Sequence, residues 1–346
     1  MAPVSVAVVI VSWNGRHHLE GCLPALRAQA FRDFSVILVD NGSTDGTVDF
    51  VRANYPEVDV VDLPENRGFA GPNNLGISRA FIDPSVRYVV TLNNDTRPEP
   101  GYLAELVACA GRHADAGAIQ PKVVNYYEPT RIDSAGILIS RDMNAVNRGL
   151  GETDTGQYAR EEELFGASAS AALYCREALE VTALPRPDGT VDYFDGDYFA
   201  YYEDVDLAWR LRLAGFPAYY APHAVVWHVH SATGKSCSPF KAFYIHRNLF
   251  CNIIKNLPLR QLVRALVLMP GVYWTALREV VSGRGAAAEV ADRGRGGEHP
   301  VRLVIRGWWQ VLRMLPALLA KRSRIQAARK ADGREIEHWF DRFAIR

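Results

Sequence analysis

Acidic and amide side chains recur directly after short apolar runs in the first hundred residues. Asp40 follows "SVILV", and the triplet Asn93-Asn94-Asp95 follows "YVVTL". Hard cations such as Mg²⁺ and Mn²⁺ take carboxylate oxygens as ligands and keep waters or phosphate oxygens beside them. Asn and Asp also form tight turns, because their side chains bond to their own backbone. On spacing alone, the triplet is as consistent with a turn as with a metal site.

A second acidic group, Glu203-Asp204-Val205-Asp206, falls where a helix is expected to begin. Acidic residues in a first turn stabilise a helix by about 0.3–1 kcal/mol, which requires no function. The aromatic run "YFAYY" precedes the group, however, and rings packed on a carboxylate would reduce its solvation and keep it basic. Asp204 is therefore a candidate general base, and a simple helix cap is the alternative.

The pattern "AVVWHVH" predicts a strand with His228 and His230 on one side. His228 could complete a metal shell or contact a diphosphate, although a single His on a strand is more often structural. Lys235, Arg210 and Arg247 could offset phosphate charge, and their spacing does not decide among them.

The elements that would position these residues alternate in type. Strands are predicted at 6–11, 35–39, 58–63 and 88–92, and helices at 16–30, 45–54 and 71–81. This order predicts an α/β fold with a mostly parallel, Rossmann-like sheet flanked by helices, which binds ligands at the carboxyl ends of its strands. Polar loops follow the four strands at 12–15, 40–43, 64–68 and 93–95. We place the site at this edge.

The loops favour a nucleotide-sugar enzyme over a dehydrogenase. A dinucleotide site needs G-x-G-x-x-G in its first turn, and this turn has only Gly15. Glycosyl transfer needs positive charge for the departing diphosphate, a carboxylate base for the acceptor hydroxyl and a polar clamp for the nucleobase. Asp40 could accept from the imide N–H of uracil or thymine. Ser43 and Thr44 are expected to cap the next helix, which leaves Asp40 for that role.

Composition narrows the class of protein. The chain has 346 residues, 48% of them hydrophobic, enough for one large core or one domain with an appended helical piece. Lys+Arg and Asp+Glu balance at 39 each, which argues against a nucleic-acid partner. The five cysteines include no C-x-x-C pair and are expected to be reduced thiols of a cytoplasmic protein. The apolar run at 4–11 lacks a basic region before it and is interpreted as a strand rather than a signal peptide.

The last ninety residues, 256–346, are expected to be helical. The apolar run at 265–277 contains Pro270 and Gly271 and is shorter than the roughly 20 residues that span a membrane. Residues 284–299 are predicted to be a mobile linker. Segment 300–330 carries eight Lys or Arg, no acidic residue, and Trp308 and Trp309. It could lie on an anionic membrane surface, or it could pack on the catalytic domain or on a second subunit of a homodimer.

Seven blocks occur in an order that resembles the family 2 glycosyltransferases with the GT-A fold, and the rhamnosyltransferase-like branch in particular. They are "VVIVSWNG", "ILVDNGSTDGT", "ENRGFAGPNNLGI", "LNNDTRP", "YFAYYEDVDLAWRLRLAGF", "VVWHVHSATGK" and "YIHRN". The blocks cover about residues 4–255. The resemblance implies a GT-A domain over 1–255, with a nucleotide-binding half at about 1–118 and an acceptor half at about 119–255, followed by a helical extension.

The same resemblance implies an inverting, metal-dependent transfer from a dTDP- or UDP-sugar, dTDP-L-rhamnose first, to a glycan or a lipid-linked acceptor. The reaction would take place in the cytoplasm or on the inner face of the cell membrane. The implied nucleotide-binding residues are Val11, Ser12, Trp13, Asp40, Arg67 and Asn94. The implied ligands of Mg²⁺ or Mn²⁺ are Asp95 and His228, the catalytic residues are Asp204 and Glu203, and the diphosphate contacts are Lys235 and Arg247. Asn93 stands where the family's D-x-D has its first Asp.

Two other functions are weighed against this one. A nucleotidyltransferase would need a glycine-rich basic loop after the first strand, and "SWNGRHHLEG" matches that poorly. A non-catalytic nucleotide- or glycan-binding module would bind the donor without turnover.

Overall fold

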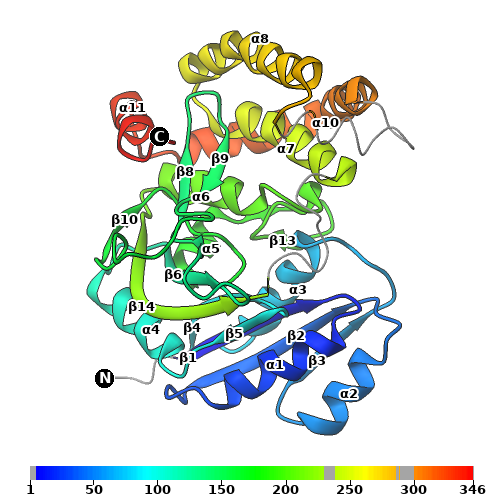
Figure 1. Cartoon of the computed structure of the whole chain (residues 1–346), viewed down its shortest axis with the longest axis vertical. Coiled ribbons are helices and arrows are strands. Elements are labelled where there is room, and N and C mark those ends of the chain that lie inside the picture. The colour runs from blue at the N-terminus through cyan, green and yellow to red at the C-terminus, as the bar shows by residue number, and fades with distance from the viewer. Residues whose placement is uncertain (1–4, 230–237, 286–287, 289–299, 346) are drawn as a thin grey trace.

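The protein is described by a computed structural model that covers residues 5–229, 238–285, 288 and 300–345. A mixed sheet runs through its centre in the order β10-β14-β6-β11-β4-β1-β2-β3 (Figure 1). The strands are β1 (Ser5–Ser12), β2 (Phe34–Asn41), β3 (Asp59–Leu63), β4 (Val86–Asn93), β6 (Ala118–Asn125), β10 (Glu162–Leu164), β11 (Leu173–Cys175) and β14 (Ala218–His228). Two short strands extend the sheet, β5 (Thr96–Pro98) beside β14 and β7 (Ile132–Ser134) beside β6.

The half of the sheet formed by β3, β2, β1 and β4 is entirely parallel. Its inner strands β1, β2 and β4 are buried runs of β-branched and apolar residues, as expected for strands covered on both faces. β11 then runs antiparallel between β4 and β6, and β14 returns parallel to β6. The predicted mostly parallel α/β fold is confirmed.

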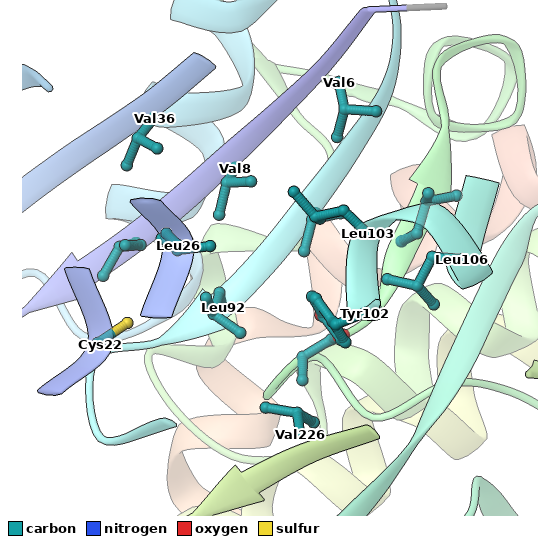
Figure 2. Packing of buried hydrophobic residues seen from close by; sticks show 14 of the residues in the cluster. Val6, Val8, Cys22, Leu26, Val36, Leu92, Tyr102, Leu103, Leu106 and Val226 are labelled. Carbon is teal, nitrogen blue, oxygen red and sulfur yellow. The ribbon is translucent and has the colours of Figure 1, made fainter. Parts of the chain in front are cut away.

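Helices cover both faces of the sheet. They are α1 (Arg16–Arg27), α2 (Thr47–Asn54), α3 (Ala70–Ala80), α4 (Tyr102–Arg112), α5 (Arg176–Thr182) and α6 (Glu203–Leu213). Figure 2 shows Cys22 and Leu26 of α1 and Leu103 of α4 in one cluster with Val8 and Leu92 of the sheet. On the opposite face, α3, α5 and α6 contribute to a second cluster. Both faces of the sheet are therefore buried against helices.

Four helices follow the sheet: α7 (Pro239–Asn256), α8 (Leu259–Ser282), α10 (Pro300–Ala328) and α11 (Gly333–Arg342). They gather at the end of the molecule away from β1–β3 (Figure 1). A third core cluster joins Trp209 of α6 to Phe250 of α7, Val311 of α10 and Trp339 of α11. The proposed boundary at residue 255 stays a prediction, because this core spans it.

None of the described helices is long and apolar enough to cross a membrane. Most of the linker predicted at 284–299 lies outside the described residues.

Candidate active site

The carboxyl ends of β1, β2 and β4 lie side by side. In the sheet register, Ser12 pairs with Asp40 and Val11 pairs with Asn93. The Asn94 side chain donates from Nδ2 to Ser12 Oγ at 3.0 Å. Residues predicted from three separate motifs therefore share one edge of the sheet.

Asp40 is completely buried at this edge. Its Oδ2 accepts from the Ser43 backbone N–H at 2.8 Å, as in a tight turn. Its Oδ1 is also buried and has no hydrogen-bond partner among the described residues. A buried acceptor without a donor is costly, so a ligand N–H at this atom would remove the cost. Closing the turn uses one oxygen of Asp40 and leaves the other available to a ligand.

The prediction that Ser43 and Thr44 cap the next helix is wrong. Ser43 Oγ accepts from the Asn14 N–H at 2.8 Å, and the Thr44 N–H donates to Asn14 Oδ1 at 2.8 Å. These contacts tie the second polar loop to the first. Asp45 accepts from the Thr47 N–H at 3.1 Å instead, and the helix begins at Thr47 rather than Asp45.

Two side chains near this edge are open to solvent. Trp13 is 46% exposed, so its indole can stack on a flat ring. Arg67 is exposed, and its Nε lies 3.7 Å from Glu65 Oε1 in a loose surface pair. The Arg67 backbone N–H donates to Asn41 Oδ1 at 2.8 Å, which fixes the third polar loop against β2.

Asp95 and His228 meet at the end of β14. His228 Nε2 lies 3.2 Å from Asp95 Oδ1, and both side chains are about nine-tenths buried, with exposed fractions of 12% and 11%. β5 makes this contact possible, since it pairs His228 with Thr96, next to Asp95. The other ring nitrogen, Nδ1, lies 3.4 Å from Asp133 Oδ2.

The two carboxylates dominate the charge state of His228. Burial alone lowers its pKa, but hydrogen bonds to Asp133 and Asp95 outweigh burial and raise the pKa to about 9. For Asp95 the effects are opposite in sign. Burial raises its pKa, but the hydrogen bond and charge of His228 outweigh burial, so the pKa of Asp95 is lowered overall. A carboxylate beside an imidazole nitrogen, with a second carboxylate on the far ring nitrogen, is the donor set that orients a metal-binding His. Asp95 Oδ1 and His228 Nε2 could be ligands of Mg²⁺ or Mn²⁺, provided that the imidazole gives up its proton when the ion binds.

The motifs did not single out Asp133 or His18. Asp133 lies in the short strand β7, and nothing in its local sequence indicates a role. His18 Nε2 is buried without a hydrogen-bond partner among the described residues. Burial and then His17 lower the pKa of His18, with smaller effects of Asp95 and His228, which places it near that pair. The only signal for His18 in the sequence is the doublet His17-His18, one residue after the first polar loop.

The three carboxylates of the α6 first turn have different surroundings. Asp206 is fully buried, with Oδ2 2.9 Å from Arg210 Nε and Oδ1 2.8 Å from Lys255 Nζ. The Arg210 guanidinium is therefore buried against Asp206 and does not face a diphosphate. Glu203 is buried, its Oε2 has no partner among the described residues, and burial followed by the charge of Asp204 raises its pKa to about 8.

Asp204 is the carboxylate of this group that is only half buried. Its Oδ1 accepts from the Val205 N–H at 2.8 Å, and its Oδ2 lies 3.4 Å from the Ala169 N–H. Burial raises its pKa. The neighbouring residue Ser170 accepts the Asn93 N–H at 2.8 Å. Segment 169–170 thus touches both Asp204 and the polar corner at the end of β4.

Of the predicted diphosphate contacts, Lys235 lies outside the described residues. Arg247 is buried, and its Nη2 donates at 2.8 Å to the backbone carbonyls of both Asp197 and Tyr198. Its Nη1 donates to Gln310 Oε1. The guanidinium is occupied by the protein's own acceptors, which argues against the assignment of Arg247 to the diphosphate.

One group of three metal-ligand types, Cys109, His113 and Glu161, lies within 4.8 Å among the described residues. Glu161 already binds Arg112 Nη2 at 2.5 Å and His113 Nε2 at 2.7 Å. The pairs of Glu161 with Arg112 and His113 account for the closeness of these side chains without a bound metal ion.

The fold is the GT-A type, and solved structures share it. The likeness extends to Staphylococcus aureus TarS residues 1–349, with a TM-score of 0.52, 14% identity and coverage of 97% of this chain and 91% of that one. It also extends to a Pyrobaculum calidifontis mannosyltransferase in complex with GDP-Man and Mn²⁺, with a TM-score of 0.51, 18% identity and coverage of 93% and 85%.

The sequence comparisons identify the family. The family model described as glycosyl transferase family 2 matches residues 7–182, and the chain belongs to this family. It is 30% identical over 262 residues to the N-acetylglucosaminyl-diphospho-decaprenol L-rhamnosyltransferase of Mycobacterium tuberculosis, covering 69% of this chain and 80% of that protein. It is 27% identical over 229 residues to the poly-beta-1,6-N-acetyl-D-glucosamine synthase of Staphylococcus aureus, covering 64% of this chain and 49% of the synthase.

The predicted resemblance is therefore confirmed, and the protein is a glycosyltransferase rather than a nucleotidyltransferase or a binding module.

Proposed function

We propose that this enzyme transfers L-rhamnose from dTDP-L-rhamnose to a hydroxyl group of a lipid-linked acceptor, with inversion at the anomeric carbon. The observation that carries the proposal is the 30% identity over 262 residues to a mycobacterial enzyme named for L-rhamnose transfer to a decaprenol-linked sugar. A glycan hydroxyl without a lipid is the alternative acceptor.

Asp204 is the proposed general base. The acceptor oxygen attacks the anomeric carbon, the bond from that carbon to the diphosphate oxygen breaks, and Asp204 receives the hydroxyl proton. Its pKa, raised by burial, makes the carboxylate a stronger base than an exposed Asp, and its partial exposure leaves room for an acceptor. Glu203 and Asp206 suit this role less well, because the first is buried and the second is fully paired.

The nucleotide is proposed to bind along the ends of β1 and β2. Asp40 Oδ1 would accept from the thymine imide N–H, and Val11, Ser12 and Trp13 would surround the base. Arg67 and Asn94 complete the proposed nucleotide site. The unpartnered oxygen of Asp40 supports this placement.

Asp95 and His228 are the proposed ligands of Mg²⁺ or Mn²⁺. The ion would offset negative charge on the departing diphosphate. Asp133 would hold the imidazole from its other nitrogen. Mn²⁺ is named with a nucleotide or nucleotide sugar in the structures of the mannosyltransferase and of GalNAc-T7.

We further propose that the enzyme works in the cytoplasm, on the inner face of the cell membrane. The helix α8 exposes an apolar row that includes Leu259, Val263, Trp274 and Leu277. The helix α10 exposes Trp309 and Leu312 on the face that does not pack on α7. Exposed arginines flank both rows: Arg260, Arg264, Arg278, Arg302 and Arg313. Arginines beside exposed apolar side chains suit an anionic lipid surface, so we favour anionic lipid over a second subunit as its partner.

A donor screen tests the proposal directly. The melting temperature of the enzyme would be measured with Mn²⁺ and dTDP-L-rhamnose, UDP-N-acetylglucosamine or GDP-mannose, because a ligand that binds the folded state stabilises it. We expect the largest increase with dTDP-L-rhamnose, and release of dTDP when a polyprenyl-diphosphate-linked N-acetylglucosamine is added. A larger increase and faster turnover with UDP-N-acetylglucosamine would replace the donor assignment.

A further inference from the structure

Three aromatic residues directly before the α6 acids adopt a backbone conformation that L-residues rarely take. Phe199, Tyr201 and Tyr202 have φ angles of 62°, 66° and 70°. Such residues cost about 1–3 kcal/mol each and persist only where their surroundings impose the conformation. Tyr202 is the N-cap of α6, so this segment sets where Asp204 points.

The side chain of Asn248, on α7, binds this segment. Asn248 is completely buried. Its Nδ2 donates to the backbone carbonyls of Tyr198, Ala200 and Tyr201, at 3.1, 2.9 and 2.6 Å. Arg247, the preceding residue, donates to the carbonyls of Asp197 and Tyr198, as described above. The Arg-Asn pair of "YIHRN" thus binds the backbone carbonyls of four of the five residues 197–201.

The same face of α7 continues these contacts. Asn252 lies one turn after Asn248, and its Oδ1 accepts from the Tyr198 hydroxyl at 3.2 Å. Lys255 lies one turn further on and pairs with both Asp195 and Asp206. One buried polar face of α7 therefore holds the segment before α6 and the first turn of α6 itself.

The third polar loop closes on the segment from the opposite side. The Phe69 N–H donates to the Phe199 carbonyl. A Cβ at Gly68 would lie 2.2 Å from that carbonyl oxygen, so only glycine fits there. The segment is thus fixed between the nucleotide half and α7.

We infer that Asn248 is a positioning residue for catalysis: its carboxamide holds segment 199–202, in which Phe199, Tyr201 and Tyr202 have positive φ, in the conformation that directs the Asp204 carboxylate toward the acceptor. The inference rests on the proposed role of Asp204 as the base. Asn248 itself touches neither substrate nor metal in this assignment. Its contribution should therefore appear in the chemical step, and donor binding should be largely independent of it.

The first experiment measures this separation. In Asn248→Ala, we expect kcat to fall about 10- to 100-fold, because a misplacement of about 1 Å costs that much. The KM for the donor and the dTDP affinity with Mn²⁺ should stay within about twofold. Asn248→Asp, whose buried carboxyl can keep one donor when protonated, should be intermediate and serves as the test variant if Asn248→Ala does not fold. A folded variant with kcat within twofold of wild type would overturn the inference.

The second experiment tests the backbone conformation itself. Glycine adopts a positive φ without strain, so Tyr201→Gly added to an Asn248 variant should recover at least about threefold in kcat and part of the lost melting temperature. Ala200→Gly is the matched control, because Ala200 is the adjacent Asn248 acceptor and is not among the residues with positive φ. Equal recovery at both positions, or recovery at neither, would refute the positioning role.

The two proposals fail separately. If Asp204→Asn retains turnover, the base assignment fails, and the recovery of melting temperature by Tyr201→Gly still tests whether Asn248 imposes the conformation. If Asp204→Asn is inactive and no recovery occurs at residue 201, Asn248 is a structural residue only and the base assignment stands.

Discussion

At the scale of single residues, the three carboxylates at the start of α6 differ in burial, in ion pairing and in the direction of their pKa shifts. Asp206 is neutralised by Arg210 and Lys255, and Glu203 is buried against the charge of Asp204. Asp204 alone among them combines partial exposure with a raised pKa. A half-buried carboxylate can meet a hydroxyl and still remain basic.

Asp204→Asn should therefore lower kcat by about 10²- to 10⁴-fold, the usual contribution of a general base. Donor affinity should change less than about twofold, because Asn keeps the size of the side chain and its one oxygen can still accept from the Val205 N–H. Sugar transfer and calorimetric dTDP binding with Mn²⁺ would be measured together. Asp62→Asn, at an exposed carboxylate of the edge strand β3, is the control and should be fully active. Near-normal turnover in Asp204→Asn would remove it as the base.

Glu203 makes stability depend on pH. Its pKa is raised from the ordinary 4.5 to about 8 in the folded protein. Between these values the folded protein holds a proton that the unfolded chain has lost, so the free energy of unfolding falls as the pH rises. Glu203→Gln removes this dependence.

We expect Glu203→Gln to melt about 2 °C or more above wild type at pH 8.5 and close to wild type at pH 4.5. Thermal unfolding monitored by circular dichroism across this pH range gives the comparison. Glu177→Gln, at an exposed carboxylate in α5, should show no such pH-dependent gain. An equal effect of both substitutions at every pH would show that Glu203 is ionised in the folded state.

At the scale of elements, the proposed metal site at Asp95 and His228 depends on two short strands, β5 and β7, that are distant from His228 in sequence. β5 pairs with the end of β14, and this pairing brings His228 to Asp95. β7 pairs with β6 and carries Asp133 to the other side of the imidazole. Neither short strand has a marked pattern of its own, so the geometry comes from the sheet.

Asp95→Ala should abolish the Mn²⁺-dependent part of dTDP binding, because it removes the carboxylate ligand. Asp133→Asn should weaken that part about 10- to 100-fold, the usual effect of losing the partner that orients a metal-binding His. Calorimetric titrations with Mn²⁺ and with EDTA would separate the two contributions. Unchanged Mn²⁺-dependent affinity in Asp95→Ala would defeat the metal assignment, and in Asp133→Asn it would limit Asp133 to a structural role.

At the scale of the whole molecule, the C-terminal helices pack on the catalytic domain with one side and expose apolar residues on the other. The inner side of α10 contributes to the core shared with α6 and α7, and its Lys321 lies 2.6 Å from Asp195 Oδ1. Deleting residues 300–346 would expose that core and leave a buried carboxylate short of a partner. Loss of membrane binding in such a truncation would therefore be ambiguous, and surface substitutions are the sharper test.

Replacing Trp274, Leu277 and Trp309 together by Ser should reduce co-sedimentation with vesicles containing phosphatidylglycerol at least about threefold. Raising the salt concentration should weaken binding of the wild type, because arginines contribute near the surface. Ser at Ile82 and Leu150, which are 73% and 54% exposed on the catalytic domain, is the control. Unchanged co-sedimentation of the triple variant, or a new dimer-to-monomer change, would favour a second subunit as the partner.

The sequence by itself determined the fold class, the family and most of the proposed site. Alternating strand and helix patterns are local, and Asp40, Asp95 and Asp204 lie inside short motifs at the ends of those elements. The topology of a parallel sheet then places such residues at one edge. Their positions at the ends of these elements were therefore predictable without knowledge of any long-range contact.

The tertiary structure alone decided which polar residues serve the fold and which stay available. Arg247 was predicted to meet the diphosphate, but Asn248 and Arg247 bind backbone carbonyls about 50 residues earlier in the chain. Asp133 reaches His228 only through the pairing of β6 with its neighbours. Hydrogen-bond occupancy and burial depend on such distant partners, and no local pattern in the sequence encodes them.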